Sequence, residues 1–240
     1  MSASDPRAFA RAAALSAFSI LVVTCSRPAE PPTPPDVSSL LAAYAEPGGT
    51  LDPARPAAWL EAAQDQLDVL GGGEADMIVG DLVARTFERA ERAVASLPSR
   101  ESGLVPARAS GVVELETACG DRPDETAEVA VAIVDGTVSP LLWGTAHACP
   151  LWRRKNARGV YSGRFTIYRY PSGDLLIGVD GTMAGLRIPV VLDFRLVDGH
   201  VEKRVATTTG DVIAARDGLD VLARAANGVF RCDANLRRCR

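Results

Sequence analysis

The chain has 240 residues, of which 47% are hydrophobic and 23% charged, and this balance excludes a protein that is disordered throughout. Its net charge is −4, whereas domains that bind nucleic acid are usually basic, so we expect no nucleic-acid partner. Aromatic residues make up only 5% of the chain, which disfavours surfaces that stack bases or sugar rings.

The N-terminal segment is typical of an export signal. Arg7 and Arg11 precede an uncharged run that extends from Ala12 to Thr24. A helix that spans a bilayer needs about 20 apolar residues, so this run is too short to span and fits the apolar part of a secretory signal. We therefore predict a signal peptide over residues 1–24. The alternative is a buried N-terminal helix, which the proline-rich tract that follows disfavours.

The stretch Leu21-Val22-Val23-Thr24-Cys25 resembles the lipobox of bacterial lipoproteins. In that family the cysteine thiol receives a diacylglycerol, the leader is removed and the new N-terminus is acylated, with palmitate as a usual chain. The resemblance covers only these residues, and Thr24 stands where the family has Gly, Ala or Ser. It implies lipidation of Cys25, a lipid bilayer as partner, and a place on the periplasmic or outer face of the envelope. The alternative is ordinary signal cleavage near Ser26, which gives a soluble secreted protein.

Residues 25–36 are predicted to be a proline-rich tether. Five prolines in this segment favour an extended polyproline conformation: Pro28, Pro31, Pro32, Pro34 and Pro35. At about 3.1 Å per residue, ten such residues reach about 30 Å. Such a stalk would hold a folded domain off a membrane surface; the alternative is an untethered tail.

The cysteine count is odd, at five, and becomes even when Cys25 is lipidated. The other four, Cys119, Cys149, Cys232 and Cys239, then indicate disulfides in an exported protein. Three connectivities are open, and we favour Cys119–Cys149 and Cys232–Cys239, which join neighbours in sequence. A zinc site is the alternative, but the spacing lacks the close cysteine pairs of such sites, so we predict no metal and no cofactor.

Residues 37–240 are predicted to form a single α+β domain, helical over 37–98 and β-rich over 110–216. Apolar residues recur at helical spacing in 57–70 and again in 75–97. Alternating patterns and turn residues such as 171–174 then predict five or six hairpin-linked strands. A final helix is expected over 218–228, and a C-terminal disulfide loop over 228–240. We therefore expect N-terminal helices packed on a curved antiparallel β-meander or partial barrel.

Candidate chemistry in the sequence is sparse. His147 lies two residues before Cys149, so both side chains would face the same way on a strand and could form a nucleophilic pair. Asp121, Asp124 and Glu125 could bind calcium, but they lack the spacing of a known loop motif, and a solvated turn is favoured.

The sequence favours a non-enzymatic, membrane-anchored lipoprotein whose domain binds a ligand or an envelope protein. A carrier for an apolar ligand predicts a cavity of several hundred Å³ between sheet and helices, with a packed interface as the contrary result. A partner-binding module predicts an exposed apolar patch. The alternatives are an envelope enzyme built around His147 and a soluble secreted binding protein.

Overall fold

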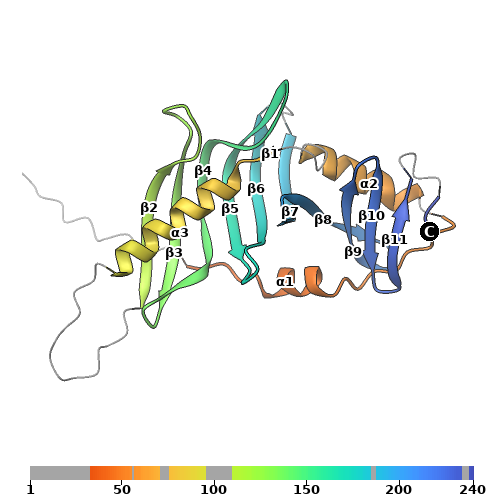
Figure 1. Ribbon diagram of the computed structural model, residues 1–240, viewed down its shortest axis with the longest axis horizontal. Coiled ribbons are helices and arrows are strands. Elements are labelled where there is room, and N and C mark those ends of the chain that lie inside the picture. The colour runs from red at the N-terminus through yellow and green to blue at the C-terminus, as the bar shows by residue number, and fades with distance from the viewer. Residues whose placement is uncertain (1–32, 56, 71–75, 96–109, 185–187, 234–237) are drawn as a thin grey trace, which may run out of the picture. The chain divides into compact units, whose positions relative to one another are not determined.

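The computed structural model describes residues 33–240 except 56, 71–75, 96–109, 185–187 and 234–237 (Figure 1). The predicted signal peptide, Cys25 and the tether as far as residue 32 lie outside the described residues.

One antiparallel sheet dominates the fold. Ten of its strands follow one another in sequence order from β2 to β11, and the short strand β1 pairs with the far end of β4. The strands are β1 (Asp76–Met77), β2 (Gly111–Ala118), β3 (Thr126–Val134), β4 (Thr137–Arg154), β5 (Ala157–Arg169), β6 (Leu175–Ala184), β7 (Ile188–Val197), β8 (His200–Thr207), β9 (Gly210–Asp217), β10 (Asp220–Ala225) and β11 (Gly228–Cys232). Among the described strands, β2 and β11 are each paired with only one other strand, so the sheet is open.

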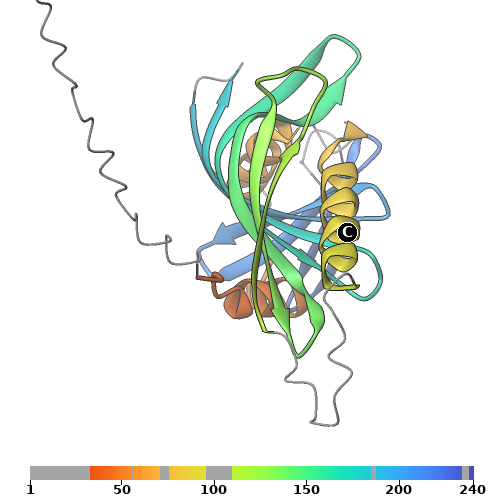
Figure 2. The ribbon, with the colours of Figure 1, turned by 90° about the vertical axis from the view of Figure 1, so that its left-hand side faces the viewer.

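Three helices accompany the sheet: α1 (Ser38–Ala45), α2 (Ala57–Val69) and α3 (Val79–Ala95). Helices α2 and α3 pack on one face, which we call the covered face, whereas α1 lies on the opposite face (Figures 1 and 2). Helix α2 buries Trp59, Ala63 and Leu67 at helical spacing, and α3 buries Phe87 beneath the guanidinium of Arg169 in β5. Among the described residues, no helix combines the length and apolarity needed to cross a bilayer.

The predicted α+β fold with helices packed on a meander or partial barrel is wrong. The helices have only 8, 13 and 17 residues, and nearly everything described after residue 110 is strand. The predicted final helix over 218–228 is instead β10 and the start of β11. Val221, Ala223 and Ala225 are buried while the residues between them are only partly covered, which is the period of a strand. High helix propensity of alanine and arginine concealed this alternation.

Glycines allow two central strands to approach closely where the sheet curves (Figure 2). Gly163 of β5 pairs with Gly181 of β6, and its φ is +146°. A Cβ on Gly163 would lie 2.5 Å from the Gly181 Cα, and a Cβ on Gly181 would lie 2.2 Å from the Ser162 carbonyl oxygen. Any side chain here would push the strands apart.

The covered face is packed. Leu67 of α2, Leu70 directly after it, and Val83 and Phe87 of α3 are at most 2% exposed and join the main apolar core with residues from β2 to β8. The cavity between α3 and the sheet has a volume of about 20 Å³, enough for about one water molecule. An apolar carrier needs several hundred Å³, so the space between α3 and the sheet is too small for such a ligand.

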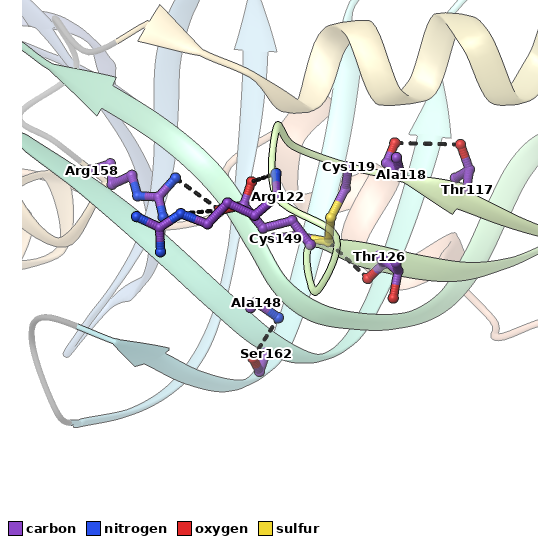
Figure 3. The surroundings of a disulfide bond; sticks show 10 residues. Thr117, Ala118, Cys119, Arg122, Thr126, Ala148, Cys149, Arg158 and Ser162 are labelled. Atoms are coloured by element: carbon purple, nitrogen blue, oxygen red, sulfur yellow. Dashed lines mark hydrogen bonds and ion pairs between the residues drawn. A yellow bond between two sulfur atoms is a disulfide. The ribbon is translucent and has the colours of Figure 1, made fainter.

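Disulfides are confirmed, and both join cysteines that are neighbours in sequence. Cys119, directly after β2, bonds to Cys149 in β4 (Figure 3). Cys232 at the end of β11 bonds to Cys239. Two backbone hydrogen bonds between Arg231 and Arg240 hold the C-terminal residue antiparallel alongside β11.

Candidate binding groove

The face opposite α2 and α3 carries a groove of about 710 Å³ over β2–β6, which we call the acidic groove. It is lined by side chains of five successive strands and, at its edge, by Thr33 and Pro35 of the segment that leads into α1. In size it matches a ligand site rather than a packing defect.

Two adjacent rows of cross-strand partners build the floor of the acidic groove. The first row runs from β2 to β6 as Glu114, Ala130, Trp143, Thr166 and Gly178. The second runs as Glu116, Glu128, Thr145, Arg164 and Asp180. Beyond Glu114 the first row carries small residues, a threonine and Trp143, whereas the second row is mostly charged, so a ligand would meet a narrow, largely uncharged strip beside a line of charges.

Trp143 offers an unused hydrogen-bond donor in the floor. The side chain is only 7% exposed, and its indole Nε1 has no hydrogen-bond partner in the described part of the chain. A buried indole N–H normally finds an acceptor, because leaving it unpaired costs about 1–3 kcal/mol. A ligand carbonyl or hydroxyl oxygen would supply that acceptor.

Three glutamates give the groove its charge. Glu114, Glu116 and Glu128 are exposed, and within the described residues none of them forms an ion pair. Glu116 and Glu128 are direct cross-strand partners, an arrangement of like charges that destabilises a sheet. Further along the same row, Arg164 forms an ion pair with Asp180 and so does not neutralise the glutamates. This pair of like charges destabilises the sheet, and no cation among the described residues offsets it, which is typical of a functional surface.

A second cluster of charges lies where β7 and β8 separate. Asp193 of β7 accepts hydrogen bonds from the Tyr44 hydroxyl of α1, at 2.8 Å, and from the Arg204 guanidinium of β8, at 2.7 Å. Arg204 also reaches Asp211 of β9, again at 2.8 Å. Burial tends to raise the pKa of Asp193, but Arg204, Lys203 and the Tyr44 hydroxyl outweigh it and hold the pKa below its ordinary value.

Lys203 is the most buried cation of this cluster. It is 3% exposed, and its Nζ lies 3.8 Å from Asp193 Oδ1, too far for a good hydrogen bond. Burial lowers the pKa of Lys203 to about 8, against the opposing effect of Asp193. Asp193 is therefore the counter-charge of this buried cation, and Lys203 shares it with Arg204.

The structure separates His147 and Cys149, the nucleophilic pair of the alternative enzymatic interpretation. Cys149 is buried in the disulfide, whereas His147 is exposed. Between them Ala148 has φ +51° and the pairing of β4 with β5 shifts by one residue, so the alternation on which the prediction relied is interrupted (Figure 3). This geometry removes the Cys–His pair.

The predicted solvated turn holds one buried carboxylate. Asp121 and Asp124 are exposed, but Glu125 is 1% exposed and pairs with Arg158 at 2.9 Å. Burial opposes the charged form, yet the Arg122 backbone N–H and the Arg158 guanidinium hold the pKa of Glu125 below its ordinary value. No cluster of the described residues has the ligands to hold a metal ion. Glu125 braces the loop beside the Cys119–Cys149 bridge.

The residues of the acidic groove were not singled out from the sequence, although part of the signal is there. Glu114 and Glu116 alternate with apolar residues in β2, which placed them on one face. Trp143 lies beside these glutamates because of the register in which β4 pairs within the sheet, and no local sequence pattern determines that register.

Comparison with models of protein families, with curated proteins and with solved structures finds no match to this chain. The functional argument therefore depends on the chemistry of the chain itself.

Proposed function

We propose that the protein is a membrane-anchored, exported lipoprotein whose domain binds a basic, extended polypeptide segment in the acidic groove. The anchor is the lipidated Cys25, and the tether of residues 25–36 carries the domain. The observation that supports the binding function is the coincidence of three unpaired glutamates with the unpaired indole N–H of Trp143 in one groove.

A polypeptide supplies both kinds of group that the acidic groove lacks. Lysine or arginine side chains would pair with the glutamates, and a backbone carbonyl would accept the Trp143 N–H. The acidic groove crosses five strands, so a segment bound along it must be extended to contact them all. Electrostatic attraction of this kind increases the rate of association and weakens as salt is added.

The remaining alternatives have less support. No ligand-sized cavity lies between α3 and the sheet among the described residues, and His147 and Cys149 do not form a catalytic pair. The soluble secreted form would keep the same groove and the same disulfides, and differs from the proposal only in how the chain is processed near Cys25.

Neutralising the groove is expected to weaken the binding of a basic peptide. The combined change Glu114→Gln, Glu116→Gln and Glu128→Gln removes three attractions of about 0.2–1 kcal/mol each, so affinity should fall about tenfold at low salt. The probe is a fluorescent decapeptide of alternating lysine and alanine, with binding followed by anisotropy at several salt concentrations. Trp143→Phe keeps an aromatic side chain, smaller than the indole, but removes the donor and should weaken binding by about threefold to tenfold.

A matched variant separates a groove effect from an effect of net charge. Glu46→Gln, Glu88→Gln and Asp124→Asn remove three exposed carboxylates that do not line the acidic groove. Affinity in this variant should stay within about twofold of the original. Equal weakening in both triple variants, or no binding by the unmodified protein, would refute the groove as the binding site.

The anchor is tested by the mass of the protein extracted from membranes of a bacterial host. We expect a mature chain that begins at Cys25 and carries diacylglycerol and an acyl chain, with the remaining four cysteines oxidised. Cys25→Ala should abolish the lipid and release the domain from the membrane fraction. An unlipidated N-terminus at residue 27 in the unmodified protein would contradict the anchor and support the soluble form.

A further inference from the structure

The sheet opens between β7 and β8. Their pairing begins at Val197↔His200, beside the turn, and ends at Phe194↔Lys203. Strand β7 continues to Ile188 and pairs there only with β6, whereas β8 continues to Thr207 and pairs there only with β9. The two strands therefore leave facing edges without a partner, which we call the slot.

The register shows which backbone groups point into the slot. Val197 and His200 close a two-residue turn through Asp198 and Gly199, both with positive φ, so they form a hydrogen-bonded pair. From Val197 along β7, every second residue therefore directs its backbone N–H and C=O away from β6 and towards β8. Among the residues whose side chains are described, the last two in this series are Asp193 and Val191. By the same alternation Arg204 and Ala206 direct theirs out of β8. Pro189, which has no N–H, also stands at such a position, as proline does on a free strand edge.

Tyr44 ends the β7–β8 ladder. Its hydroxyl accepts a hydrogen bond from the backbone N–H of Arg204 at 3.1 Å and donates one to Asp193 Oδ1. The Arg204 N–H is the group that would otherwise reach the Asp193 carbonyl. The hydroxyl from α1 thus holds the strands apart, and the separation is built into the fold.

Pockets lie on both faces of the slot and meet within it. On the α2 side is a pocket of about 370 Å³, and on the α1 side one of about 580 Å³. The residues that line both pockets are Val191, Leu192, Asp193, Arg204 and Asp211. Val191 is 78% exposed, although it belongs to a strand of the sheet.

We propose that the slot binds an extended polypeptide segment of a partner protein, which pairs as a strand with the free edge of β7. Successive side chains of a strand point to opposite faces, and this matches a slot with one pocket on each face. The backbone groups of Val191 and Asp193 provide the hydrogen bonds, and Val191 packs against an apolar side chain of the segment.

The charges beside the slot are already satisfied by one another. Arg204 pairs with Asp193 and Asp211, and Lys203 lies against Asp193. The slot therefore selects an uncharged segment through its backbone, in contrast to the acidic groove, which selects basic residues. Binding in the slot is accordingly insensitive to salt and is unchanged when the three groove glutamates are replaced.

The test uses uncharged heptapeptides selected from a random library against the full chain. Val191→Pro removes the N–H that points into the slot, while the hydrogen bonds of β7 with β6 remain, so binding should fall at least tenfold. Val191→Thr keeps the N–H and a similar shape, and should bind within about threefold of the unmodified protein.

Two measurements on the unmodified protein test the proposal even if Val191→Pro does not fold. N-methylation of the peptide, one residue at a time, should reduce affinity at alternate positions only, and the bound peptide should slow hydrogen exchange at the amides of Val191 and Asp193. The proposal is overturned by an N-methylation profile without alternation, by peptides that oligo-lysine displaces, or by a failure to select any peptide sensitive to Val191→Pro. A dimer of the chain that Val191→Pro abolishes would also overturn it, because a second copy would then occupy the slot.

Discussion

Asp193→Asn is expected to lower the free energy of unfolding by about 3–5 kcal/mol, the usual result of removing one partner from a buried ion pair. The variant leaves Lys203, which is 3% exposed, without its nearest carboxylate. It also removes the charge that pairs with the Arg204 guanidinium. The measurement is urea unfolding followed by circular dichroism at pH 7.

A matched control lies on the same hairpin. Asp198→Asn removes one carboxylate in the exposed turn, where φ is +47° and asparagine is readily accepted. This variant should change the free energy of unfolding by less than about 0.5 kcal/mol. If Asp193→Asn cost no more than Asp198→Asn, the cluster would not stabilise the separated strands, and the account of the slot would lose its basis.

Lys203→Met tests the same cluster from its cationic side. Because burial lowers the pKa of Lys203 to about 8, the folded protein releases this proton between about pH 8 and 10 while the unfolded chain keeps it. The unfolded state then binds more protons, so stability rises with pH across that window, by at most about 3 kcal/mol. Lys203→Met should lack this rise and should be at least as stable as the original at pH 7, since Arg204 and Tyr44 still satisfy Asp193. If the stability of Lys203→Met still rose with pH across this window, the rise would come from another titrating group.

Local patterns predicted individual elements better than the architecture. The alternation in β2 and the helical spacing in α2 and α3 follow from side-chain burial, and the structure shows both. The segments β4 and β10 were missed for different reasons. Strand β4 contains Pro140, Gly144 and Pro150, which interrupt a strand signal, and in β10 alanine and arginine favoured a helix. Together these errors moved the prediction from an extended open sheet to a smaller sheet with helices.

The candidate sites could not be found from local patterns, because both depend on long-range register. Trp143 and Glu114 are 29 positions apart in the sequence and lie in the same row only after three strands have paired. Tyr44 and Asp193 are separated by 149 positions, and α1 offers no motif that marks its tyrosine as a wedge. The cysteines are the contrary case, since the redox compartment and an even count limit their partners before any fold is known.

The Cys119–Cys149 bridge has the other large expected effect. It closes a separation of 30 residues and joins the end of β2 to the bulge in β4, with both sulfur atoms in the main core. Constraining a loop of this length is worth about 3.5 kcal/mol on the chain-entropy model, so the variant Cys119→Ala and Cys149→Ala should lose about 2–5 kcal/mol. Alanine is used instead of serine because serine would bury a hydroxyl in place of each sulfur.

The second bridge provides the comparison, because Cys232 and Cys239 are only 7 residues apart. The variant Cys232→Ala and Cys239→Ala should lose about 2.5 kcal/mol or less by the same model. Urea unfolding of both variants, with and without reductant, distinguishes the effect of the loop from the effect of the core. Because the first bridge fixes the β2 edge that carries two groove glutamates, its removal should also weaken binding of the basic decapeptide, whereas removal of the second bridge should not. Equal losses of stability and of binding in both variants would show that the Cys119–Cys149 bridge does not position the acidic groove.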